Sequence, residues 1–156
     1  MDKKIILTKL IESLNLELIE VESAAKSTKD LVTADDLKSE GKYDTRAIEA
    51  SYLASAQLKR VEEIKTDIQM LEDIELIDAE KVQMGSLVLI EFKGQQRYYF
   101  LTTTSGGTML MVDGNPVLVI SVFSPIGNEA LGLGAGESFE VETPKEMRTY
   151  KIIKVS

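Results

Sequence analysis

The first half of the chain has apolar residues at the spacing of two long amphipathic helices. The first stripe alternates steps of four and three: Leu7, Ile11, Leu14, Leu18, Val21 and Ala25, continued by Thr28 and Val32. The second stripe has the same spacing: Tyr43, Ala47, Ala50, Ala54, Gln57, Val61, Ile64, Ile68 and Leu71. This spacing places the stripe residues along one seam of each helix. Two such seams joined by a short polar turn predict an antiparallel helical hairpin, or coiled coil.

The register of the hairpin follows from pairing the two seams. Pairing Leu14 with Val61 centres the turn between Leu37 and Lys38, although a slip by a full heptad preserves the pattern. The arm from Leu7 to this turn is about 45 Å long at 1.5 Å per residue. Its seam changes from large aliphatic residues to alanine toward the turn, which predicts a thin distal part. The alternative is a compact helical pair within an ordinary core.

Glycine and proline interrupt the second half every few residues. All three prolines and all but one of the ten glycines lie after residue 84. The apolar runs between them predict strands at 87–92, 97–103, 108–112, 138–143 and 148–155, with an extended segment at 117–122. Close spacing with glycine turns predicts an antiparallel sheet. One short helix fits between the strands, with Ser124 as its N-cap and Pro125 at its first position.

The predicted fold is therefore of the α+β class. We expect a helical hairpin over residues 1–76 with an acidic tip near 33–43, a linker over 77–84 and a β domain over 85–156. The β domain would contain one short helix, as argued above.

Composition restricts the chemistry available to these 156 residues. The chain has no Cys and no His, which excludes disulfides, thiol nucleophiles, zinc–thiolate sites and imidazole bases. Its net charge of −8 makes it a poor candidate for strong duplex DNA binding. Metal chemistry would rest on carboxylates, which suit Mg²⁺. No apolar run is long enough for a membrane span or a signal peptide, so we expect a cytoplasmic protein.

Several short motifs resemble those of bacterial Gre (GreA/GreB) transcript-cleavage factors. The residues of this chain that resemble the Gre C-terminal domain are Gly85-Ser86, Ser124-Pro125-Ile126, Ala130-Leu131-Gly132, Gly136, Val141, Thr143-Pro144 and Tyr150-Lys151-Ile152. The residues that resemble the acidic tip of the Gre coiled coil are Asp36-Leu37, Ser39-Glu40 and Tyr43. The resemblance covers nearly the whole chain and keeps the order of its parts. It implies an FKBP-like fold for the β domain.

The resemblance also implies a function. A transcription elongation factor of this family is not an enzyme; as a monomer it binds RNA polymerase and inserts its coiled coil into the secondary channel. There it stimulates the polymerase to cleave backtracked RNA near the 3′ end of the transcript. In this sequence Asp36 and Glu40 would help hold a second Mg²⁺ shared with the polymerase, while the protein alone binds no cofactor. A second metal stabilises the attacking and leaving oxygens of a phosphoryl displacement.

The tip departs from the family pattern. Counted back from Tyr43, Ser39 stands where Gre factors have a glutamate, and Glu40 follows one position later. An insertion before Ser39 with a deletion after it brings Glu40 into place, and Asp35 is an alternative carboxylate. Otherwise Asp36 only caps the second helix and Glu40 is a solvated acid. The departure leaves open a Gre-like regulator or inhibitor without cleavage activity, and an interaction module of another class is a third alternative.

The resemblance implies two further contact sites. The candidates for RNA contact on the hairpin are Lys26, Lys29 and Arg46, where a mixed solvated face is the alternative. The candidates for docking on the polymerase rim are Phe123, Ser124 and Pro125. An exposed Phe123 would be an apolar docking contact, but we expect a core residue because aromatic side chains are more often buried.

Overall fold

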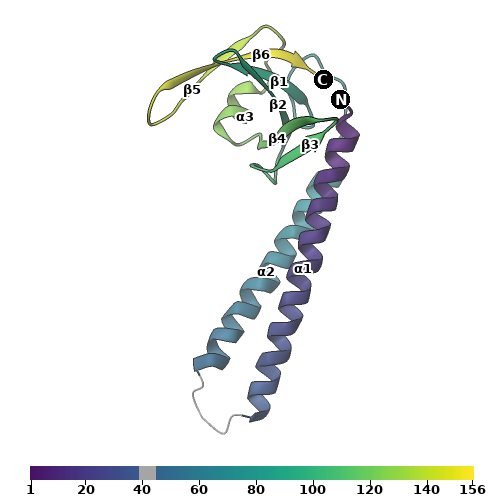
Figure 1. The fold of residues 1–156 in the computed structure, drawn as a ribbon, viewed down its shortest axis with the longest axis vertical. Helices are drawn as coiled ribbons and strands as arrows, with labels where there is room; N and C mark the ends of the chain where they lie inside the picture. The colour runs from purple at the N-terminus through teal and green to yellow at the C-terminus, as the bar shows by residue number, and fades with distance from the viewer. Residues whose placement is uncertain (39–44) are drawn as a thin grey trace. The chain divides into compact units, whose positions relative to one another are not determined.

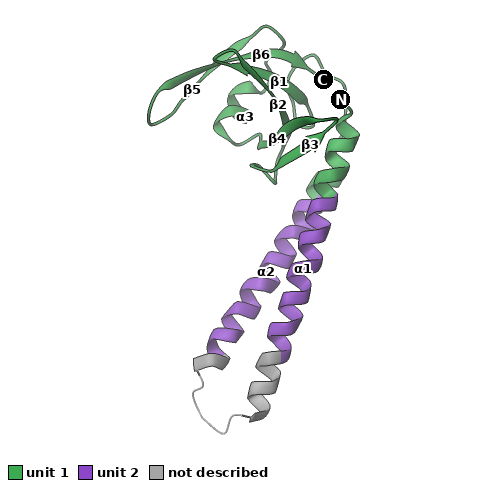
Figure 2. Cartoon of the chain, viewed as in Figure 1, with its two compact units in different colours: residues 1–11, 70–156 green, residues 12–69 purple. Residues whose placement is uncertain are grey.

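The computed structural model describes the backbone of residues 1–38 and 45–156 and the side chains of residues 1–30 and 48–156. The predicted hairpin is formed by α1 (Lys3–Lys38) and α2 (Thr45–Glu72), and the β domain follows it (Figure 1). The chain divides into two compact units, residues 12–69 and residues 1–11 with 70–156 (Figure 2). Across the described ranges, no helix combines the length and the apolar character that a membrane span requires.

The unit of residues 12–69 is held together by the predicted seam. Leu14, Val61 and Ile64 are each less than 8% exposed, whereas the residues between the seam positions face solvent. Beside the seam, Arg60 Nε donates a hydrogen bond of 3.2 Å to Glu17 Oε1 across the two helices. Because exposed ion pairs contribute only about 0.2–1 kcal/mol, the apolar seam is the main source of stability.

The predicted position of the turn, centred between Leu37 and Lys38, is wrong. Helix α1 continues to Lys38 and α2 begins at Thr45, so the midpoint between the helices lies within 39–44. If one helix slips past the other by one heptad, the midpoint between them moves by about half a heptad, which is the displacement observed here. A seam with a seven-residue repeat presents an equivalent face after such a slip, so its period alone does not fix the register. The helix bounds also exclude Asp36 as the N-cap of α2, since it lies within α1.

The β domain contains one six-stranded sheet with the order β3-β4-β2-β1-β6-β5. The strands are β1 (Leu87–Phe92), β2 (Gln95–Thr102), β3 (Met109–Val112), β4 (Asn115–Ser121), β5 (Ser138–Glu142) and β6 (Met147–Val155). Two hairpins turn at Lys93-Gly94 and Asp113-Gly114, where both residues have positive φ as tight β-hairpins require.

The sheet is mixed, where a wholly antiparallel one was predicted. Strands β2 and β4 pair in parallel, and all other neighbours are antiparallel. The reason is the position of β3, which forms a hairpin with β4 but lies at the sheet edge outside it. Strand β4 therefore returns beside β2 in the same direction. The extended segment predicted at 117–122 belongs to this strand.

The core of the β domain lies between one face of the sheet and the short helix α3 (Pro125–Ala130). The predicted linker 77–84 contributes to it, because Val82 is 2% exposed and its backbone N–H donates to Leu133 O at 2.8 Å. Gly85 follows with a φ of +83°, and a Cβ there would lie 2.9 Å from Ile74 Cγ2. The segment before β1 is thus fixed to the domain by backbone pairing and close packing.

The first turns of α1 belong to the same unit as the β domain. Ile6 and Leu10 are at most 1% exposed. Lys3 is 8% exposed, and its Nζ donates to Ile77 O at 2.8 Å and lies 3.1 Å from Asp78 Oδ1. Lys9 Nζ donates to Met111 O at 2.8 Å. Apolar burial and two lysine contacts therefore connect the start of α1 to the β domain.

Candidate functional site

The acidic tip lies outside the part of the chain whose side chains are described. This applies to the predicted metal carboxylates Asp36 and Glu40, to the alternative Asp35 and to the RNA-contact candidate Arg46. Among the described side chains, no group of three or more Asp or Glu residues could hold a metal ion. The roles of these four residues stay predictions.

The other two RNA-contact candidates lie along one groove of the hairpin. Lys26 and Lys29 are exposed on α1 and line a cavity of about 550 Å³ whose floor includes Ala25 and Ala54. Lys65 lines the same groove, but its Nζ lies within 3.9 Å of a carboxylate oxygen of Glu22 and of Glu62. The groove thus has an apolar floor and a rim of mixed charge. It brings Lys26 and Lys29 together, and their contact with RNA stays a prediction.

The docking candidates form the turn between β4 and α3. Ser124 is the N-cap of α3, as predicted, and Pro125 occupies the first helical position. Ser124 Oγ accepts a hydrogen bond of 3.1 Å from Gly127 N and donates one of 2.6 Å to Ser121 O. The cap therefore connects the helix to the end of the strand, and an N-cap of this kind contributes about 1 kcal/mol.

Two residues that the sequence reasoning missed complete this turn. Ser121 Oγ accepts a hydrogen bond of 3.1 Å from Phe123 N. Gly127 is buried, and a Cβ at this position would lie 2.1 Å from Ser121 O, so only glycine permits the close approach of α3 to β4. The available signal was the glycine directly after the Ser-Pro-Ile motif, within the first turn of a capped helix.

The turn presents apolar side chains to solvent. Phe123 is 78% exposed, and Pro125 is also exposed. The expectation that Phe123 is a core residue is therefore wrong. Val122, directly before it, is 8% exposed and takes the core position at the end of the strand. An exposed phenylalanine on a turn fixed by several hydrogen bonds is suited to contact an apolar surface of a partner.

Comparisons with known proteins agree with the motifs. Residues 77–156 match the model of the family described as transcription elongation factor, GreA/GreB, C-terminal. The transcription elongation factor GreA of Desulfovibrio desulfuricans is 32% identical over 125 residues, which cover 78% of this chain and 71% of that protein. The GreA of Christiangramia forsetii is 29% identical over 152 residues, which cover 96% of this chain and 91% of that protein.

Among solved structures, GreA factor homolog 1 (Gfh1) of Thermus thermophilus aligns with a TM-score of 0.39 at 21% identity, covering 94% of each chain. A likeness this loose carries no inference about function. The family model, in contrast, matches more than half of the chain, and it includes α3 and all six strands of the β domain. The chain therefore belongs to the GreA/GreB family of transcription elongation factors.

Proposed function

We propose that this elongation factor binds RNA polymerase, extends its helical hairpin into the secondary channel and stimulates cleavage of backtracked RNA. The observation that carries the proposal is the combination of the family's β domain with a long hairpin whose connecting segment is flanked by acids. The protein would act as an accessory to the polymerase, whose own active site performs the cleavage.

The two parts of the chain have separate tasks in this proposal. The turn at Phe123, Ser124 and Pro125 docks on the rim of the channel, which its exposed apolar residues support. The hairpin supplies reach, because the 28 residues of α2 extend about 42 Å. Its alanine-rich distal seam keeps the arm narrow, as entry into a confined channel requires. Lys26 and Lys29 would contact the extruded RNA from their shared groove.

The tip carboxylates would complete a metal site held mainly by the polymerase. Mg²⁺ is bound by one or two protein carboxylates together with water and phosphate oxygens, so Asp36 and Glu40 are sufficient for a shared ion. Such an ion would stabilise the charge of the in-line displacement. The residues of this chain would position the ion and accept a hydrogen bond from the attacking water. Aspartate and glutamate are the only side chains in this sequence suited to that role, since it lacks His and Cys.

The test uses backtracked elongation complexes with Mg²⁺ and follows RNA length on a gel. We expect cleavage with the unaltered chain, and loss of cleavage with retained polymerase binding for Asp36→Ala and for Glu40→Ala. Asp35→Ala is the matched control and should keep activity. Unchanged RNA length at saturating protein would contradict the proposal. Loss with Asp35→Ala alone would move the metal role to Asp35.

A second candidate function follows from the serine at position 39. Because Ser39 stands where the family pattern has a glutamate, the protein is alternatively a channel-binding regulator that slows synthesis without stimulating cleavage. Slower nucleotide addition on complexes that are not backtracked, with no cleavage products, would support this alternative. The substitution Ser39→Glu, which restores the glutamate of the family pattern, should then create or raise cleavage activity.

A further inference from the structure

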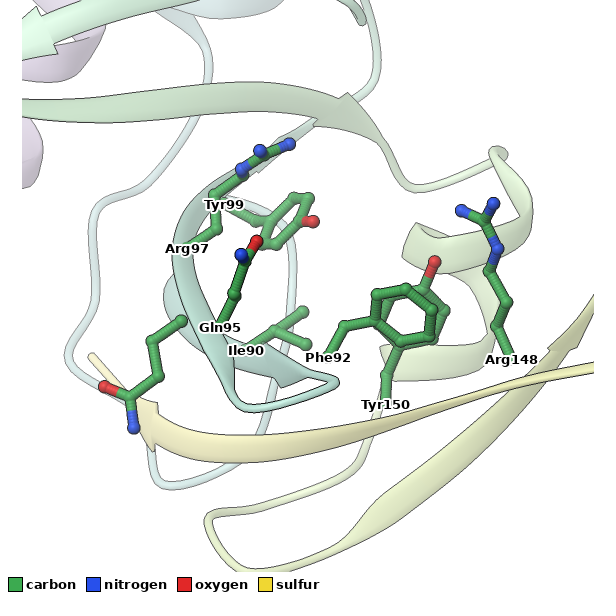
Figure 3. Close-up of a pocket in the computed structure, with 8 residues that line it drawn as sticks. Ile90, Phe92, Gln95, Arg97, Tyr99, Arg148 and Tyr150 are labelled. Atoms are coloured by element: carbon green, nitrogen blue, oxygen red, sulfur yellow. The ribbon is translucent and has the colours of Figure 1, made fainter.

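A small cavity opens on the sheet face of the β domain, formed by residues of β1, β2 and β6. Its volume is about 150 Å³. Strand β2 supplies Arg97 and Tyr99 on one side, and β6 supplies Arg148 and Tyr150 on the other (Figure 3). None of these residues belongs to the docking turn or to the hairpin. The predicted functional sites therefore leave this cavity without a role.

The alternation of the strands explains why these side chains converge. Side chains two residues apart point to the same face, so Arg97 lies beside Tyr99 on β2 and Arg148 beside Tyr150 on β6. Tyr99 and Tyr150 are 7% and 4% exposed and belong to the core that α3 covers. On each of the two strands, this face therefore changes from a buried tyrosine to an arginine over two residues.

Of the two guanidinium groups that line the cavity, only that of Arg148 takes part in an ion pair within the described ranges. Arg148 Nε lies 3.2 Å from Glu146 Oε1 without forming a hydrogen bond, and Lys93 Nζ lies 3.4 Å from both oxygens of that carboxylate. Glu146 is thus shared between two cations. Arg97 is exposed and forms no ion pair with any acid in the described ranges.

The phenol of Tyr99 is a neutral hydrogen-bond donor at neutral pH. Burial raises the pKa of Tyr99 above its usual value of 10.0, and the charge of Arg97 only partly opposes this effect. A neutral phenol beside a guanidinium is able to donate a hydrogen bond to an incoming oxygen anion, and both groups bind carboxylates strongly where water is partly excluded.

The aromatic rings favour a protein ligand over a nucleic acid. Tyr150 stacks on Phe92 at 4.9 Å and on Phe139 at 5.4 Å between ring centroids. Lys93 Nζ and Arg148 Cζ lie 5.2 and 5.3 Å from the Phe92 ring centroid. Binding of single-stranded RNA relies on open aromatic faces for base stacking, and these rings are already covered.

The volume restricts the ligand to one side chain. A protein cavity of about 150 Å³ accepts a group the size of benzene. This is enough for the end of a glutamate or aspartate and too small for a nucleotide. The chain has a net charge of −8, so an acidic segment would be repelled by most of its surface and attracted at such a cationic site.

We propose that this cavity binds the carboxylate of an acidic side chain presented by a protein partner, with Arg97 and the Tyr99 hydroxyl as its principal donors. The inference goes beyond the proposed cleavage function and does not depend on it. It adds a second contact point to the β domain, separate from the turn at Phe123.

The test is an NMR titration of the ¹⁵N-labelled full chain with two capped pentapeptides, acetyl-GGEGG-amide and acetyl-GGQGG-amide. We expect the glutamate peptide, at millimolar concentration, to shift the amides of residues 95–99 and 148–150, and the glutamine peptide to leave them unchanged. Arg97→Gln should weaken binding about tenfold. Lys154→Gln, an equal loss of charge at the far end of β6, is the matched control and should bind normally.

Three outcomes would overturn the inference. One is an equal response to both peptides, and another is the absence of any shift at millimolar peptide. The third is a stronger response of the same amides to a short single-stranded RNA than to the glutamate peptide. Arg97→Lys keeps the positive charge but removes the planar guanidinium group. Weaker binding of the glutamate peptide to this variant would support a direct contact with the arginine. Polymerase is absent from this test, so a negative result leaves the proposed cleavage function standing.

Discussion

Truncation of Phe123 to alanine removes the exposed aromatic ring of the docking turn. A phenylalanine side chain buries about 150–200 Å² when fully covered, and 78% exposure leaves about 120–160 Å² of it for a partner. At 25 cal/mol per Å² this corresponds to about 3–4 kcal/mol. Ordering of the side chain on binding reduces this gain in binding free energy by about 1 kcal/mol. We therefore expect Phe123→Ala to weaken polymerase binding by about 2–3 kcal/mol, or roughly 30- to 150-fold.

The assay measures the dissociation constant between labelled protein and RNA polymerase by fluorescence anisotropy. The matched control is Met147→Ala, which truncates a side chain that is 57% exposed at the start of β6. Circular dichroism should show the same thermal transition for Phe123→Ala and the unaltered chain, since the ring makes little contact with the core. Unchanged affinity for Phe123→Ala, with the fold intact, would refute the assignment of this turn as the docking surface.

Three further predictions concern stability and pH. Gln57→Leu should stabilise the hairpin against urea by about 1–2 kcal/mol, because Gln57 Oε1 is buried without a hydrogen-bond partner in the described part of the chain; exposed Lys59→Leu should not. Gly127→Ala should destabilise the β domain by about 2–4 kcal/mol through the clash with Ser121 O, whereas exposed Asn128→Ala should have little effect in the same denaturation assay. The raised pKa of Tyr99 means that the unfolded chain loses its phenol proton first, so stability should fall as pH rises above 10.0; Tyr99→Phe should reduce this loss in denaturation curves at pH 9–11.

Local chemistry in the sequence predicted much of the fold. The predicted Ser124 cap is confirmed, and the glycine turns expected between strands lie at Lys93-Gly94 and Asp113-Gly114, because each is a short-range preference of a few adjacent residues. The parallel pairing of β2 with β4 was missed because it depends on where β3 lies in the sheet. Periodicity marks a strand and its faces, but it does not specify the neighbours of that strand.

The candidate sites were predictable to different degrees. Ser124 and Pro125 stand in a recognisable capping motif, and the structure places them as predicted. The exposure of Phe123 was not predictable from composition, since an aromatic residue beside an apolar strand is more often buried. The cavity beside Arg97 was missed because its lining comes from three strands. The signal present in the sequence was a run of three polar residues, Gln95, Gln96 and Arg97, at the start of the strand that contains Tyr99.

The position of the hairpin turn determines how the tip acids should be tested. A slip of one heptad moves the turn by about four residues, or about 6 Å along a helix axis, which is larger than a metal–oxygen distance of about 2 Å. Both Asp35 and Asp36 fall within α1, whereas Glu40 lies beyond its last residue. Neighbouring residues on a helix are about 100° apart around its axis, so one ion is reached by only one of two adjacent acids. Cleavage should therefore respond unequally to Asp35→Ala and Asp36→Ala, and equal losses would contradict a helical placement of the catalytic acid.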